Sequence, residues 1–222
     1  MTHRLQILAA AAGVIACAMS QDVSAQEPVD PPIRFEVGGT PGGGMFLTGG
    51  DDDTEANFNV YTFSANVAYY LTQRLAVEGE YMFGNGWGQD VVFRQGLLVG
   101  QQLPFSNAFT GGVLYYPKGA TGTALPFYVG GGMGVMSLIS RPTTVKVNYD
   151  SDIVGSESFM VSRIGGGIKL PQGAGAPNWA FRLDYRLIVI SRNDNAPLFF
   201  ARNKSRTGHQ FQFGIQYAFR RR

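Results

Sequence analysis

The chain has 222 residues, with 18 Lys and Arg against 16 Asp and Glu, a formal net charge of +2 and 30 glycines. This length suits one domain, and so small a net charge argues against a nucleic-acid partner. No apolar run reaches the ~18 residues of a membrane helix, but that test misses membrane strands, in which apolar and polar residues alternate.

The first 25 residues have the features of a secretory signal peptide. Arg4 precedes the apolar run LQILAAAAGVIACAM, and the tripeptide VSA before residue 26 is a small-x-small cleavage site. We therefore expect a signal peptide over 1–25 and one domain over 26–222. The string VIAC, which ends at Cys17, also resembles a lipoprotein signal. Removal of Cys17 with the signal is favoured over its lipidation and leaves the exported chain without a disulfide.

Period-two alternation recurs along the rest of the chain and predicts eight strands. They span residues 33–46, 57–71, 75–88, 103–116, 126–139, 158–170, 179–192 and 208–219. Ordinary strands have about 5 or 6 residues, whereas these are long enough for a tilted strand to cross a bilayer. The segment VVFRQGLLVG, residues 91–100, either extends its neighbours or forms a ninth strand.

The connections between the predicted strands fall into two groups. Those at 72–74, 117–125 and 171–178 are the shorter ones, and those at 47–56, 89–102, 140–157 and 193–207 are the longer ones. Short turns at one end and longer loops at the other are the layout of an outer-membrane barrel.

The clearest predicted strands have one face without charge and one face of small or polar residues. In the last strand, Phe211, Phe213, Ile215, Tyr217 and Phe219 alternate with glutamine, glycine and alanine. A water-facing surface is usually rich in Lys and Glu, whereas the polar faces here are small or neutral at most sites. We therefore expect the aromatic faces to lie against lipid and the polar faces to line a lumen.

The charges expected to point inward nearly balance. They are Arg34, Arg163, Lys169, Arg182 and Arg186 against Glu36, Glu78, Glu80 and Asp184. The interior of an eight-stranded barrel is just wide enough for side chains to fill, and an unpaired buried charge costs several kcal/mol. We predict that Glu78, Glu80, Arg182, Asp184 and Arg186 form an ion network that plugs the lumen. A gate in a narrow pore is the alternative.

The stretches YYLTQRLAVEGEYMFG, PFYVGGGMG, FRLDYRLIVI and FQFGIQYAF resemble the small outer-membrane β-barrel family, which includes the outer membrane protein A barrel and the opacity-type surface proteins. The resemblance implies an all-β, eight-stranded antiparallel up-and-down transmembrane barrel in the outer membrane of a Gram-negative bacterium. It also implies a lumen closed by ion pairs of Glu78 or Glu80 with Arg182 or Arg186. In that family the barrel assembly machinery reads an aromatic C-terminal residue, here Phe219, although residues 220–222 extend beyond it.

Four other features have ordinary explanations. The acidic residues 51–53, Asp150, Asp152 and Glu157 are expected in solvated loops rather than at a cation. Arg192, Arg202, Lys204 and Arg206 are expected in or beside a solvated loop, with contact to lipid phosphates as the alternative. The glycine runs VGGGMG and IGGGIK lie inside strands with no helix after them, so they are not nucleotide-binding. They supply curvature and space, which Tyr70 and Tyr116 are expected to fill.

His209 is the one histidine left after processing, and by parity it faces lipid without a nearby Ser or Asp. We therefore expect a non-enzymatic surface or envelope-integrity protein, with no cofactor or metal, whose partners are outer-membrane lipid and lipopolysaccharide. A small porin-like channel for ions or small solutes is the alternative. A lipid-modifying enzyme and a soluble barrel that binds an apolar ligand are less favoured. The sequence identifies neither an extracellular partner nor the oligomeric state.

Overall fold

The computed structural model describes residues 33–48, 59–86, 91–92, 98–99, 105–120, 125–139, 156–171, 178–192 and 205–220. The expected signal peptide with Cys17, the acidic residues 51–53, 150 and 152, and the loop cations at 202 and 204 lie outside these ranges. In the described part of the chain, no helix is long and apolar enough to cross a membrane.

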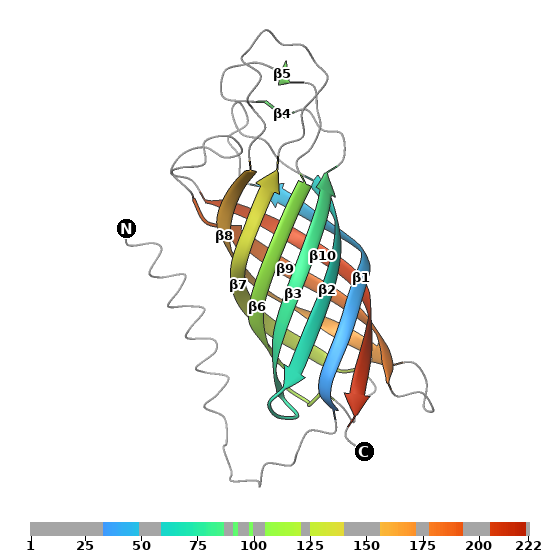
Figure 1. Ribbon diagram of the computed structural model, residues 1–222. Coiled ribbons are helices and arrows are strands. Elements are labelled where there is room, and N and C mark those ends of the chain that lie inside the picture. Colours follow the sequence, from blue (N-terminus) through green and yellow to red (C-terminus); the bar gives the residue numbers. More distant parts are fainter. Residues whose placement is uncertain are drawn as a thin grey trace, which may run out of the picture. The chain divides into compact units, whose positions relative to one another are not determined.

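Eight long strands form a closed barrel in which all neighbours are antiparallel (Figure 1). They are β1 (Ile33–Thr48), β2 (Asn59–Tyr70), β3 (Leu75–Gly86), β6 (Phe105–Tyr115), β7 (Phe127–Ile139), β8 (Ser156–Pro171), β9 (Trp179–Ile190) and β10 (Arg206–Arg220). Each strand pairs with the barrel strand before it in the chain, and β10 pairs with β1 to close the sheet. The predicted all-β, eight-stranded up-and-down barrel is confirmed.

The segment VVFRQGLLVG adds no ninth strand to the barrel. It contains the short strands β4 (Val91–Val92) and β5 (Leu98–Val99), which pair with each other in a separate two-stranded sheet.

The two ends of the barrel are named here by their connections. At the turn end, where β1 begins and β10 ends, residues 71–74, 116–126 and 172–178 join neighbouring strands, and the other four connections define the loop end. The predicted sorting of short and long connections to opposite ends is incomplete, because the turn-end connection 116–126 is no shorter than the loop-end connection 49–58.

One turn-end connection contains a left-handed glycine. Gly119 has a φ of 84°, a value that favours glycine. The N–H of Ala120 donates to the carbonyl of Gln73 at 2.8 Å and ties two turns together.

Large apolar side chains are exposed on the outside of all eight barrel strands. On β10, Phe211, Phe213, Ile215 and Phe219 are exposed, and Tyr217 is half-buried beside the ring of Trp179, with 4.8 Å between the ring centroids. A soluble monomer rarely exposes apolar patches larger than a few hundred Å². A closed barrel also leaves no sheet edge unpaired, as a lipid solvent requires. This exterior is therefore a lipid-facing surface.

The prediction that Arg34 points into the lumen is wrong. The β1–β10 register shifts between Ile33 and Phe35, so alternation breaks there and Arg34 is exposed on the outside. Its Nε donates to the hydroxyl of Tyr69 at 3.3 Å. Among the barrel-strand residues whose exposure is described, Arg34 is the single exposed charged side chain. It lies at the turn end, where a membrane-spanning surface meets water.

Candidate functional site in the barrel lumen

The inward side chains change character along the barrel. On β9, from the turn end toward the loop end, they are Arg182, Asp184 and Arg186, followed by Ile188 and Ile190. β3 repeats this order, with two buried glutamates followed by a buried methionine. On these two strands the charges therefore occupy the middle of the lumen and its turn-end side. The loop-end side is mainly apolar, although Arg206 of β10 is buried there.

Three cations and three carboxylates meet in the middle of the lumen. All are buried or nearly so, and they come from β3, β8 and β9. At neutral pH their formal charges sum to zero. We call this group the ion cluster; its members are Glu78, Glu80, Arg163, Arg182, Asp184 and Arg186.

Arg182 contacts two carboxylates of the ion cluster and one tyrosine, and its side chain is 2% exposed. Its NH1 donates to Glu78, and its Nε donates to Asp184 Oδ2 at 2.7 Å. Nε also lies 2.5 Å from the hydroxyl of Tyr128, and the guanidinium lies over the Tyr128 ring, 5.0 Å from its centroid. The Tyr128 hydroxyl in turn donates to Asp184. The guanidinium is therefore held on two sides by carboxylates and on one by an aromatic face.

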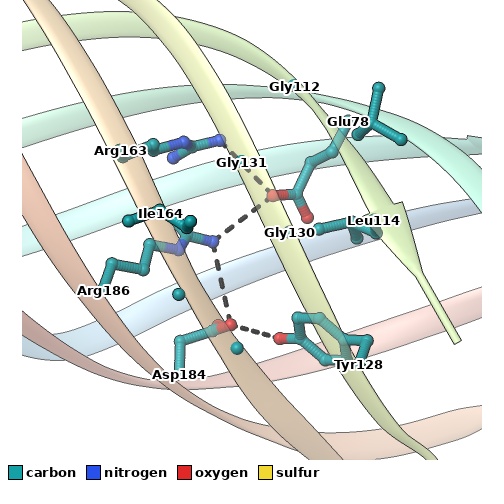
Figure 2. A pocket seen from close by; sticks show the side chains of 13 residues that line it. Glu78, Gly112, Leu114, Tyr128, Gly130, Gly131, Arg163, Ile164, Asp184 and Arg186 are labelled. Carbon is teal, nitrogen blue, oxygen red and sulfur yellow. Dashed lines mark hydrogen bonds and ion pairs between the residues drawn. The ribbon is translucent and has the colours of Figure 1, made fainter. Parts of the chain in front are cut away.

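Arg186 and Arg163 converge on the two glutamates. NH1 of Arg186 lies 2.7 Å from both carboxylate oxygens of Glu80, and NH1 of Arg163 lies 2.7 Å from Glu80 Oε1. Both arginines also reach Glu78 Oε1, at 3.3 Å from Arg186 and 3.5 Å from Arg163 (Figure 2). Figure 2 also shows Arg186 between Glu78 and Asp184, joined to Asp184 at 3.8 Å. The cluster is thus one connected network.

Uncharged side chains of β2 and β10, the strands next to β3 and β9, extend the network. Asn66 Nδ2 donates to Glu78 Oε2 at 3.0 Å, and Gln216 Nε2 donates to Asn66 Oδ1 at 3.0 Å. Charged and neutral donors therefore share the four lone-pair positions of Glu78, as a buried carboxylate requires.

A second ion pair lies closer to the turn end. Lys169 Nζ donates to Glu36, and it also lies 2.7 Å from the hydroxyl of Tyr70. The Tyr70 hydroxyl is 2.8 Å from Glu36 Oε2 and 3.1 Å from the hydroxyl of Tyr116. Tyr70 and Tyr116 point into the lumen, 2% and 0% exposed. The tyrosine that lies beside the glycine runs, however, is Tyr128.

The structure brings together the five residues predicted to form an ion network, and it pairs Glu78 with Arg182 and Glu80 with Arg186. The prediction left out Arg163, although parity had placed it inside, and it gave Tyr128 no role. Nine charges were expected inside from the sequence, and removing Arg34 leaves four cations and four carboxylates. Each of these eight side chains forms an ion pair.

Glycines make the wall beside the ion cluster thin. Gly112 of β6, Gly130 and Gly132 of β7, and Gly165 of β8 leave no room for a side chain. A Cβ on Gly165, for example, would lie 2.1 Å from the backbone oxygen of Tyr185. A cavity of about 20 Å³ lies between this wall and the cluster (Figure 2). That volume accommodates about one water molecule. The glycine runs therefore allow close packing of the neighbouring strand backbones.

Buried apolar side chains fill the lumen at the loop end, which the sequence analysis did not predict. Seven of the eight barrel strands contribute to this group. We call it the apolar layer; its members are Met45, Leu47, Val60, Met82, Ala108, Met136, Leu138, Phe159, Val161, Ile188 and Ile190. β10 adds Gln210, whose Nε2 lies 3.0 Å from Met82 Sδ.

The remaining candidate residues lie apart from the lumen network. His209 faces outward, and its Nδ1 is 2.8 Å from the hydroxyl of Tyr185, on which its ring stacks. Arg192 is exposed beyond the end of β9, as expected. The expectation of a solvated loop is wrong for the other two described residues. Glu157 is half-buried in β8, and Arg206, the first residue of β10, is buried inside the loop end. Among the described residues, no three His, Cys, Asp or Glu side chains are grouped to hold a metal ion.

Solved structures resemble this fold, whereas no protein-family model and no curated protein matches the sequence. Neisserial surface protein A matches 83% of this chain and 97% of its own, with 10% identity and a TM-score of 0.57. A second match is the N-terminal β-barrel domain of Pseudomonas aeruginosa OprF, with 14% identity, 83% of this chain and 96% of the other chain covered, and a TM-score of 0.47. A third is the attachment invasion locus protein Ail of Yersinia pestis, with 14% identity, 84% of this chain and 99% of the other chain covered, and a TM-score of 0.44. At such identities the likeness is one of fold.

The fold and the exterior together define the class of the molecule. The closed barrel has the fold of the small eight-stranded outer-membrane barrels, and its outward side chains are apolar on every strand. The chain is an integral outer-membrane β-barrel protein.

Proposed function

We propose that this protein is a closed, non-enzymatic barrel with a surface or envelope-integrity role, and that its lumen is plugged. The observation that carries the proposal is the filling of the lumen along its length. From the turn end, the Glu36–Lys169 pair with two tyrosines, the ion cluster and the apolar layer follow one another, each of them buried. A pore needs a continuous water path, and buried side chains occupy the lumen in each of these layers.

The partners of such a protein are the lipids around it and whatever its loops meet. The apolar exterior supports contact with outer-membrane lipid, including lipopolysaccharide on the loop side. Phe219, exposed near the end of β10 with its ring 5.6 Å from that of Phe35, is the residue we propose for recognition by the barrel assembly machinery.

The surroundings of His209 support a non-enzymatic role. A catalytic histidine needs a nucleophile or a carboxylate within hydrogen-bond reach. The contact described for His209 is to the hydroxyl of Tyr185, on the outside of the barrel.

Conductance tests the proposal directly. We expect the purified, refolded barrel to give no resolved single-channel steps in planar bilayers, because charged and apolar side chains occupy the lumen. An empty-detergent sample and a known open porin serve as controls. Reproducible steps from the folded barrel would reject the plug and select the small-channel alternative.

A further inference from the structure

We propose that the apolar layer at the loop end, and not the ion cluster, is the barrier that stops ions in the lumen. This inference rests on the proposed function, a closed lumen, and names the part of the lumen that closes it. The ion cluster is neutral, connected and central, so it is the obvious candidate for a plug. The distribution of polar groups along the lumen argues for the other region.

Most of the buried charges lie between the turn end and the ion cluster, beside smaller apolar side chains such as Ile33 and Leu114. Lys169, Glu36 and the tyrosine hydroxyls form one hydrogen-bonded group, and the Tyr116 and Tyr128 rings, 5.3 Å apart between centroids, link it to the cluster. The charged groups can exchange partners with a passing ion or water, since their hydrogen bonds replace hydration. The cavity of about 20 Å³ beside Arg163 adds space for water.

The apolar layer offers a passing ion much less replacement for its hydration. Its largest inward side chains include Met45, Met136, Leu138 and Ile190, all 0–1% exposed. An ion that entered this layer would lose its hydration and gain few ligands in return, which is unfavourable. The buried polar groups at this level are Thr62, Ser106 and Gln210, together with Arg206, whose positive charge further opposes a cation. Apolar constrictions in channels block conduction by excluding water. The apolar layer lies between the ion cluster and the loop end of the barrel, because Ile188 and Ile190 follow Arg186 toward the loop end of β9.

The position of two methionines makes the layer testable. Met45 belongs to β1 and Met136 to β7, which are four strands apart in either direction around the barrel and therefore face each other across the lumen. Replacing both by serine shortens and polarises opposite sides of the layer. Met133 of β7 and Met160 of β8 point outward, 61% and 53% exposed, and provide a matched control with the same chemical change.

The experiment compares three double variants in liposomes loaded with an ion-sensitive dye, each first checked for folding by its migration in unboiled gels. For Met45→Ser/Met136→Ser we expect ion flux at least about tenfold above wild type, the change given by a barrier about 1.4 kcal/mol lower. For Met133→Ser/Met160→Ser and for Glu78→Gln/Arg182→Gln, which removes the central ion pair, we expect flux equal to wild type.

The proposal is overturned if the Glu78→Gln/Arg182→Gln barrel conducts, or if the folded Met45→Ser/Met136→Ser barrel stays at wild-type flux. Should the serine variant not fold, Met45→Gln/Met136→Gln keeps the side-chain length and takes the same test. High flux through the wild-type barrel would instead reject the proposed closed lumen, so the two failures are distinguishable.

Discussion

Replacing Arg182 by alanine should lower the free energy of unfolding of the barrel by about 3–5 kcal/mol, the usual cost of removing one partner from a buried ion group. Arg182 is 2% exposed and contacts Glu78, Asp184 and Tyr128. Its loss leaves the ion cluster with two cations and three carboxylates. The remaining arginines still reach Glu78 and Asp184, so the net negative charge is shared rather than confined to one group.

Urea titration of the barrel in lipid vesicles, followed by tryptophan fluorescence, measures this effect. Arg34→Ala is the matched control, because Arg34 is an exposed arginine on the outside of β1 and surface substitutions usually change stability by at most about 0.5 kcal/mol. Equal unfolding midpoints and slopes for the two variants would mean that the ion cluster does not contribute to stability as described.

Ile164→Lys should impair insertion and folding in a bilayer. Ile164 lies in the middle of β8 and is 49% exposed on the outside. A lysine on the lipid face near the midplane costs about 2–4 kcal/mol, whereas one near the interface costs about 0–1 kcal/mol. The measurement is the fraction of folded barrel after mixing with vesicles, read as unboiled gel migration.

The control for this prediction is a lysine near the loop end of the barrel. Thr48 is the last residue of β1 and is exposed, so Thr48→Lys should fold to nearly the wild-type fraction. If Ile164→Lys folds as well as Thr48→Lys, the outward face of β8 does not lie against hydrocarbon.

Much of the fold could be predicted from the sequence because alternation is a local signal. A period of two fixes which side chains share a face without knowledge of the neighbouring strand. The predicted ranges for the eight strands therefore match β1, β2, β3 and β6 to β10 closely, and Glu78, Glu80, Arg182, Asp184 and Arg186 all point inward.

What could not be predicted depends on how strands meet. Arg34 faces outward because of a register shift between β1 and β10, two strands at opposite ends of the chain. The choice of Glu78 for Arg182 and Glu80 for Arg186 depends on the relative offset of β3 and β9 across the lumen.

The apolar layer escaped prediction for a different reason. Near the loop end, strands such as β7 carry apolar residues on both faces, with Met136 and Leu138 inside and Val135 outside. Alternation between apolar and polar is lost there. The layer becomes visible only when the inward residues of seven strands are brought together.

The central claim is that the chain forms a closed barrel with its apolar face toward lipid. The most direct measurement is gel migration of the purified protein in detergent, boiled against unboiled, together with its distribution between membrane and soluble fractions. We predict a membrane-bound protein whose apparent mass changes on boiling, since a closed eight-stranded sheet resists detergent until heated. A soluble protein with no change on boiling would contradict the claim.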